Sequence, residues 1–96
     1  IGELRLDLAT RTVEVAGRPV ALANKEFELL RVLSREPQRV FTKDELLQEI
    51  WGYRSSARTR TLDSHASRLR RKLDPGGRFV VNCWGVGYRL VEGGSA

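Results

Sequence analysis

The chain has 96 residues, 41% hydrophobic and 30% charged, which is typical of one small globular domain and excludes a large enzyme with a deep cleft. Seventeen Lys and Arg residues against twelve Asp and Glu residues give a net charge of +5, which favours a polyanionic partner such as nucleic acid or an acidic membrane surface. No apolar run approaches the ~20 residues that span a bilayer, which argues against a membrane protein.

The sequence offers little material for a metal or redox site. One cysteine, Cys83, excludes an internal disulfide and a cysteine-rich zinc site, and His65 is the single histidine, so no metal or other cofactor is expected. The start of the chain carries no signal peptide, which predicts a cytoplasmic protein. Because the chain begins at Ile1 and contains no methionine, we expect it to be a piece of a longer protein.

The first 22 residues are predicted to form an antiparallel sheet. Apolar and polar residues alternate over 3–8 and 12–16, and more weakly over 19–22, which indicates half-buried strands. The connectors at 9–11 and 17–19 are short, which favours an antiparallel meander.

Two helices are predicted next. Apolar residues recur at helical spacing over 24–36, and Pro37 marks the end of that helix. Thr42 followed three residues later by Glu45 forms a capping box, which predicts the start of a second helix over 43–51.

The remaining elements are a third helix and a hairpin. Gly52 ends the second helix, and 52–58 is a polar loop. Thr59 is the candidate cap of the third helix, which runs to Leu73. Two strands around a glycine-containing turn then predict a β-hairpin. We therefore predict one α+β domain over 1–96, with an N-terminal sheet (1–22), a three-helix core (24–74) and a hairpin (78–91).

The excess positive charge is concentrated in one segment. Residues 54–78 carry eight basic and two acidic side chains, a net charge of +6. Residues 1–53 have a net charge of −1 and residues 79–96 have a net charge of zero. A charge run is often only a solvated helix face, but this concentration raises the odds of an anionic ligand.

Helical angles separate the third helix into two faces. At about 100° per residue, Leu62, Ala66, Leu69 and Leu73 form a buried stripe. The opposite face contains three arginines and small hydroxyl residues and no acid. It consists of Arg60, Ser64, Ser67, Arg68 and Arg71, with Thr61 at its margin. Arginine reads guanine edges in the major groove, and short side chains allow close approach of the helix, so this face predicts DNA binding.

Helix, turn, helix and hairpin together are typical of a winged helix, whose second helix of the pair enters the major groove. The sequence resembles the C-terminal effector domain of OmpR/PhoB-family response regulators over 22–52, 60–74 and 81–91, the last segment with the motif GVGYRL. The resemblance implies a four-stranded N-terminal sheet, three helices and a C-terminal hairpin wing. It also implies a receiver domain before Ile1, phosphorylated on aspartate, which promotes dimerisation and binding to tandem direct repeats of DNA.

Matching positions give each candidate residue an implied role. Base or groove contacts fall on Arg60, Thr61, Ser64, Ser67, Arg68 and Arg71. Phosphate contacts fall on Thr42, Lys43, Trp51, Arg58 and Arg70, and the wing contributes Trp84 and Arg89. A loop that can contact RNA polymerase falls on Gly52, Tyr53, Arg54, Ser55 and Ser56.

Four positions depart from the family pattern. Ala23 replaces the usual threonine, which removes a capping box with Glu26 and leaves Asn24 as the alternative cap. Ala66 replaces a large aliphatic residue, which suggests a locally altered core. Ser64 stands where the family has an aliphatic or other residue near the groove, which suggests a different target sequence. Trp84 stands where an arginine usually reaches into the minor groove, which puts minor-groove reading by the wing in doubt.

The predicted function is sequence-specific binding of double-stranded DNA by the helix over 59–73, without catalysis. The alternative is a winged-helix protein-interaction module with only non-specific DNA affinity, for which an exposed Trp84 would be suited. RNA binding is disfavoured because no sheet carries a run of aromatics. His65 is expected to be structural, Cys83 a small buried hydrophobe, and the glycines at 85 and 87 part of a hairpin turn.

Overall fold

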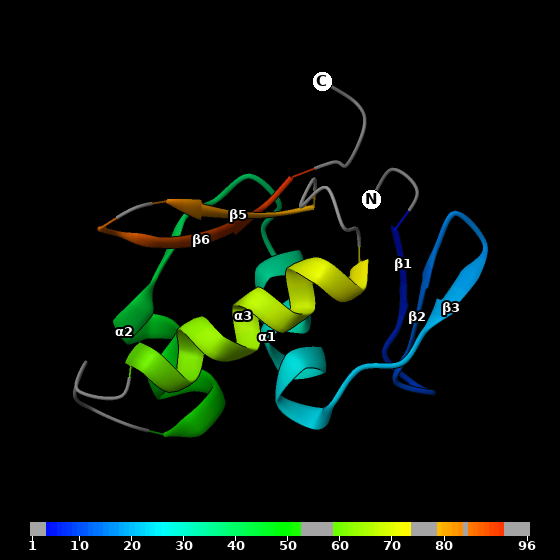
Figure 1. The fold of residues 1–96 in the computed structure, drawn as a ribbon, viewed down its shortest axis with the longest axis horizontal. Coiled ribbons are helices and arrows are strands. Elements are labelled where there is room, and N and C mark those ends of the chain that lie inside the picture. Colours follow the sequence, from blue (N-terminus) through cyan, green and yellow to red (C-terminus); the bar gives the residue numbers. More distant parts are fainter. Residues whose placement is uncertain (1–3, 53–58, 74–78, 84, 92–96) are drawn as a thin grey trace.

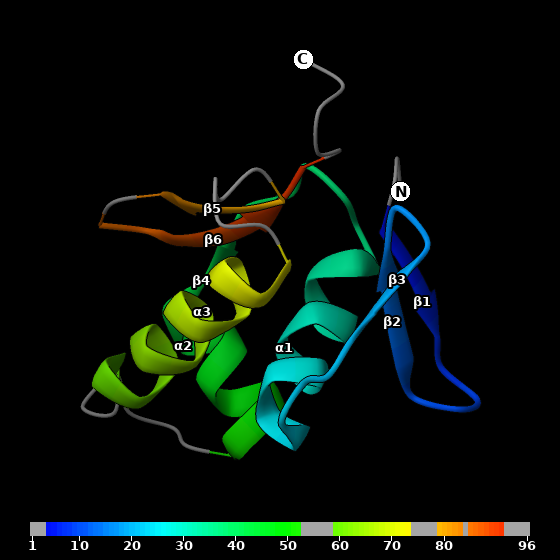
Figure 2. The ribbon, with the colours of Figure 1, turned by 45° about the vertical axis from the view of Figure 1, so that its right-hand side comes forward.

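The computed structural model describes residues 4–52, 59–73, 79–83 and 85–91, which form an α+β winged helix (Figure 1). Figure 2 shows α1 between the N-terminal sheet and α3, with the C-terminal hairpin beside α3. In chain order the elements are β1 (Leu4–Asp7), β2 (Thr12–Val15), β3 (Arg18–Val20), α1 (Asn24–Ser34), β4 (Phe41–Thr42), α2 (Lys43–Leu46), the π-helical turn η1 (Leu47–Trp51), α3 (Thr59–Leu73), β5 (Val80–Cys83) and β6 (Gly87–Leu90).

The N-terminal sheet has the strand order β1-β2-β3, all antiparallel. Within the described residues it contains three strands, so the four strands implied by the family resemblance are not found there. Its third strand begins at Arg18 instead of at residue 19, because Ala16 and Gly17 both have positive φ and form a two-residue hairpin turn. Val13 and Val15 are buried and Glu14 between them is exposed, as the alternation predicted.

The first helix begins without the expected side-chain cap. Asn24 is its first residue, and the Asn24 side chain accepts a hydrogen bond from Arg11 (2.7 Å) instead of capping the helix. Half of a capping box survives at Ala23, because Glu26 Oε1 accepts the Ala23 backbone N–H (3.0 Å). The helix ends at Ser34, two residues before the predicted end, where the serine hydroxyl donates to the Arg31 carbonyl (2.8 Å).

The second helix changes its winding halfway along. The predicted capping box is confirmed, because Thr42 Oγ1 accepts the Glu45 N–H (3.1 Å) and Glu45 Oε1 accepts the Thr42 N–H (2.9 Å). The α-helix itself stops at Leu46 and continues as the π-helical turn η1, so the uniform helix predicted over 43–51 is wrong in its second half. Gly52 ends it in the left-handed conformation (φ +80°), as predicted.

The third helix buries the predicted stripe. Leu62, Ala66, Leu69 and Leu73 are all at most 1% exposed and belong to one core with α1, α2, the N-terminal sheet and the hairpin. The helix starts at Thr59 itself, so the predicted cap is instead the first helical residue. Its apolar stripe fixes which face remains for solvent or a ligand.

The hairpin is part of a three-stranded sheet with the order β4-β6-β5. The short β4 pairs with β6, so that Phe41 lies opposite Tyr88 and Thr42 opposite Gly87. A β-carbon on Gly87 would lie 1.8 Å from the Phe41 carbonyl oxygen, so no residue other than glycine fits there. Gly85 has a positive φ (+78°), which confirms the predicted hairpin turn there.

We predict that Gly87→Ala lowers the free energy of unfolding by at least about 4 kcal/mol, because the new methyl group collides with backbone that cannot move aside. Gly85→Ala is the matched control: nothing lies within 4 Å of the position that its new methyl group would take, and only the strained φ counts, at about 1–2 kcal/mol. Urea denaturation followed by circular dichroism checks both variants. Equal losses would contradict the close approach of β4 and β6.

Candidate nucleic-acid interface

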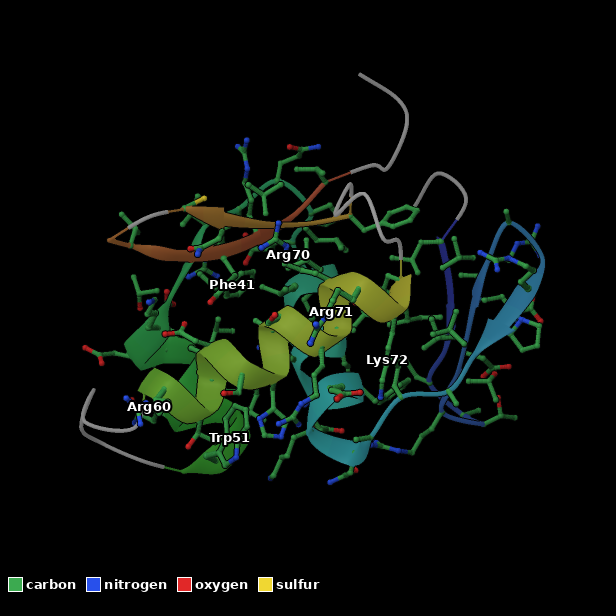
Figure 3. The ribbon with its side chains drawn as sticks, in the orientation of Figure 1. Phe41, Trp51, Arg60, Arg70, Arg71 and Lys72 are labelled. Atoms are coloured by element: carbon green, nitrogen blue, oxygen red, sulfur yellow. The ribbon has the colours of Figure 1, made fainter. Side chains whose placement is uncertain are left out.

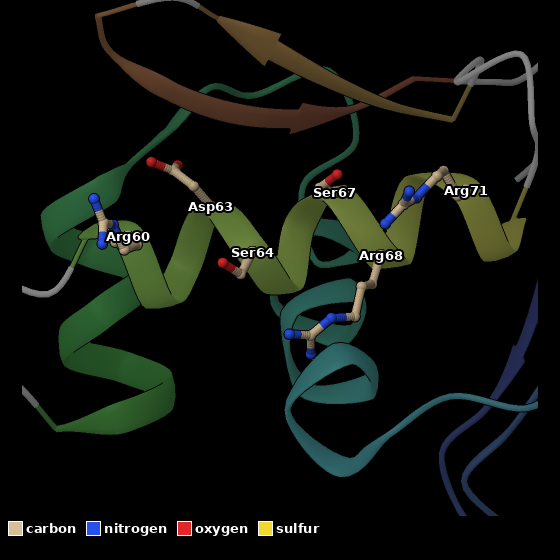
Figure 4. Close-up of a pocket in the computed structure, with 6 residues that line it drawn as sticks. All are labelled: Arg60, Asp63, Ser64, Ser67, Arg68 and Arg71. Atoms are coloured by element: carbon tan, nitrogen blue, oxygen red, sulfur yellow. The ribbon is translucent and has the colours of Figure 1, made fainter.

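The outward face of α3 lines an open groove (Figure 4). Arg60, Ser67, Arg68 and Arg71 are exposed, and Thr61 and Ser64 are half-buried. The structure therefore brings together the residues predicted to contact bases. All of them except Thr61 line the groove, together with Asp63, which the sequence analysis did not assign to this face. The full lining is Arg60, Asp63, Ser64, Ser67, Arg68 and Arg71.

Asp63 corrects the prediction of an acid-free face. It lies at the edge of the groove, where its carboxylate joins three elements. The Tyr88 hydroxyl on β6 donates to Oδ1 (2.6 Å), and Lys43 Nζ, at the start of α2, lies 3.2 Å from the same oxygen. Burial, and then the hydrogen bond to Asp63, raise the pKa of Tyr88 well above its ordinary value. This contact was missed because no local spacing links residues 20 and 25 positions apart.

A second, smaller cleft separates α3 from the hairpin. Arg70 turns toward the hairpin and away from Arg71, as Figure 3 shows. The buried Nε of Arg70 and the buried Oδ1 of Asn82 have no hydrogen-bond partner among the described residues. The cleft is lined by Lys43, Asp63, Ser67, Arg70, Asn82 and Tyr88, so it places two cations, Lys43 and Arg70, beside the groove on α3.

Trp51 and His65 pack together on the other flank of α3. Their ring centroids lie 5.2 Å apart in an edge-to-face arrangement, and Trp51 packs against the core. His65 Nδ1 donates to the Thr61 carbonyl (2.8 Å), since a carbonyl can only accept, which agrees with its predicted structural role. Lys25 Nζ donates to the Ile50 carbonyl (2.9 Å) in the π-helical turn and lies 5.7 Å from the Trp51 ring centre.

Sequence reasoning also missed an ion pair that joins α1 to α3. The carboxylate of Glu26 on α1 is 1% exposed and lies 2.7 Å from Lys72 Nζ on α3. Burial alone would raise the pKa of Glu26, but the hydrogen bonds from Lys72 and from the Ala23 N–H, with the charges of Lys72 and Arg68, outweigh it and lower the pKa. The available signal in the sequence was that Glu26 lies on an otherwise apolar face of the predicted helix over 24–36, where a carboxylate needs a partner.

Several predicted residues receive no structural test. Tyr53, Arg54, Ser55, Ser56, Arg58 and Trp84 lie outside the described residues. Gly52 is exposed, Arg89 is half-buried on β6, and Cys83 is half-buried instead of buried. No described helix is both long and apolar enough to cross a membrane, and no three His, Cys, Asp or Glu residues in the described part gather as metal ligands.

The three helices, the β4-β6-β5 sheet and the basic outer face of α3 define a winged-helix domain of the nucleic-acid-binding class. The family model described as "Transcriptional regulatory protein, C terminal" matches residues 17–90. The chain belongs to this family, the effector domains of OmpR/PhoB response regulators, which confirms the resemblance seen in the sequence.

Individual relatives agree with this assignment. The chain is 41% identical over 92 residues to the DNA-binding response regulator MtrA of Mycolicibacterium smegmatis, covering 93% of this chain and 40% of MtrA. It is similar to the AdeR DNA-binding domain solved with an intercistronic region (TM-score 0.82, 33% identity, 95% and 96% covered). It is also similar to the Klebsiella pneumoniae RstA DNA-binding domain solved with the RstA box (TM-score 0.86, 28% identity, 95% and 93% covered). The chain thus spans about two fifths of the length of the curated relative.

The lowered pKa of Glu26 predicts a pH dependence of stability. A carboxyl whose folded-state pKa is lowered stabilises the fold above its ordinary pKa of 4.5, and this stabilisation is lost as the pH falls through the folded-state pKa. Glu26→Gln should therefore make the free energy of unfolding fall less steeply than in the wild type as the pH is lowered below that value. Urea denaturation at a series of pH values measures both slopes, and identical slopes would contradict the assignment.

Proposed function

We propose that this chain binds double-stranded DNA sequence-specifically, with α3 in the major groove, as the effector domain of a response-regulator transcription factor. The observation that carries the proposal is the groove on α3, where three arginines and two serines face outward while the opposite stripe is buried. An arginine fork can donate two parallel hydrogen bonds to a guanine edge, and the serines let the helix approach the bases. Two similar domains were solved with DNA segments, which supports this use of the fold.

Two groups of residues divide the work in this proposal. Arg60, Ser64, Ser67, Arg68 and Arg71, with Thr61 beside them, read bases or line the groove. Lys43 and Arg70 converge on the cleft between α3 and the hairpin, where a phosphate would meet both charges. Thr42 and Trp51 complete the phosphate contacts, as do Arg58 and, on the wing, Arg89 and Trp84.

The proposal extends to the full-length protein. We expect a receiver domain N-terminal to this domain, pairing of two effector domains on tandem direct repeats, and a contact with RNA polymerase through residues 52–56. We assign the protein to the cytoplasm and propose no reaction for it. The division into a sheet (1–22), a three-helix core (24–74) and a wing (78–91) belongs to the same proposal.

Selection of bound sequences from a random duplex library tests the function directly. We expect enrichment of a sequence that contains two half-sites in the same orientation, with affinity that falls steeply with salt because phosphate contacts release counterions. Weak, uniform binding without enrichment would contradict sequence-specific recognition. It would favour a protein-interaction module whose basic helix is only a non-specific anchor.

Two substitutions should separate base reading from phosphate contact. Arg68→Ala should weaken binding to the selected site by ~1–3 kcal/mol and relax discrimination there, while Lys43→Ala should weaken all duplexes alike and reduce the salt slope by about 1. Arg18→Ala removes one positive charge from exposed β3 and serves as the control. Fluorescence anisotropy on the selected and a scrambled duplex measures each variant. Equal losses on both duplexes for Arg68→Ala would reduce Arg68 to a backbone contact.

A further inference from the structure

The ion pair between Glu26 on α1 and Lys72 on α3 involves the helix that also carries Arg68, the proposed base-reading arginine. We infer that Lys72 is a positioning residue for recognition: by holding the buried Glu26 carboxylate, it leaves Arg68 free to face DNA. This inference rests on the proposed function, since it concerns the availability of Arg68 in the groove.

The buried carboxylate of Glu26 requires a compensating positive charge. Its side chain is 1% exposed, and its Oε1 accepts from both the Ala23 N–H (3.0 Å) and Lys72 Nζ (2.7 Å). An ionised carboxylate that is shut off from water requires a cation, because leaving such a charge uncompensated is strongly unfavourable. Some basic side chain must therefore stay beside Glu26, on the side of α3 that faces α1.

Arg68 is a second basic side chain that could take the place of Lys72 beside Glu26. Arg68 and Lys72 are four residues apart, so they occupy neighbouring turns on one side of α3, which packs against α1. Figure 4 shows the Arg68 side chain extending from α3 toward α1, whereas Arg60 and Arg71 do not. Burial raises the pKa of Glu26, and the charges of both Lys72 and Arg68 lower it. An arginine fork is also the better geometric match for a carboxylate.

In the structure, Lys72 and not Arg68 occupies the place beside the Glu26 carboxylate. Lys72 holds the hydrogen bond to Glu26, and the exposed Arg68 has no hydrogen-bond or ion-pair partner among the described residues. Among the described residues, Arg68 is the other basic side chain whose charge lowers the pKa of Glu26. Without Lys72, it would turn inward to bind the carboxylate and leave the groove formed with Arg60, Ser64 and Ser67.

The position of Arg68 can be measured without DNA. In spectra of the arginine Nε–H groups, Lys72→Ala should give Arg68 a slowly exchanging, ordered signal that the wild type lacks. Glu26→Gln in the same background should abolish it, because the amide can still accept the Ala23 N–H but has no negative charge to attract the guanidinium. An Arg68 signal that is unchanged by Lys72→Ala would overturn the inference, whatever the outcome of the DNA measurements.

Binding measurements then test the consequence for recognition. Lys72→Ala should lower the ratio of affinities for the selected and scrambled duplexes as far as Arg68→Ala does, roughly fivefold or more, and should add no further loss of this ratio in the Arg68→Ala background. The Glu26→Gln/Lys72→Ala double variant should restore the ratio, and Arg18→Ala should leave it unchanged. Equal weakening of both duplexes by Lys72→Ala, or no rescue by Glu26→Gln, would make Lys72 a plain phosphate contact and overturn the inference. If Arg68→Ala itself leaves the ratio unchanged, the base-reading role in the proposed function fails, and the Nε–H spectra alone decide where Arg68 lies.

Discussion

The burial of one apolar stripe along α3 determines the orientation of the α3 side chains that are proposed to contact DNA bases. Because Leu62, Ala66, Leu69 and Leu73 are shut into the core, the helix cannot rotate without exposing them, and its arginines and serines must face outward. The stripe packs against α1, α2 and the hairpin together, so the same contacts that stabilise the domain also fix the recognition face. Ala66, in place of a larger aliphatic residue, is completely buried, which keeps α3 close to its neighbours.

Around this core, the acidic side chains hold basic ones in defined places. Glu28 on α1 accepts from both Arg31 and Arg11, and those hydrogen bonds, against the effect of burial, lower the pKa of Glu28 and tie the β1-β2 turn to the helix. Arg39 binds both Glu36 and Glu45 and lies over the ring of Phe41 (4.4 Å), which fixes the chain before β4. The arginines of the groove lack such partners among the described residues. The groove arginines therefore stay available to a polyanion, whereas Arg11, Arg31 and Arg39 are each paired with a carboxylate.

Regular patterns along the chain predicted the parts of the fold that depend on local periodicity. The period of the third helix identified its buried stripe, the Thr42–Glu45 spacing identified a real capping box, and the alternation in the N-terminal segment identified its strands. The remaining features depend on contacts between distant positions. The π-helical turn η1 is one such feature, since its Ile50 carbonyl is bound by Lys25 on another helix. Glu26 and Lys72, and likewise Asp63 and Tyr88, lie far apart in sequence, and no spacing rule relates them.

The carboxylate of Asp63 lies at the edge of the groove, where its negative charge would repel a polyanionic ligand. Asp63 joins the start of α2, the N-terminal half of α3 and strand β6 through Lys43 and Tyr88, so it links the hairpin to the recognition helix. Gly87 has a similar effect, because its lack of a side chain lets β4 and β6 approach and sets the base of the same hairpin. An acid in such a place lowers affinity for every DNA sequence, but the rigid spacing of Lys43, Arg70 and the groove restricts which phosphate positions can be met together. Asp63 is therefore a structural link between the hairpin and α3, and its charge is partly compensated by Lys43.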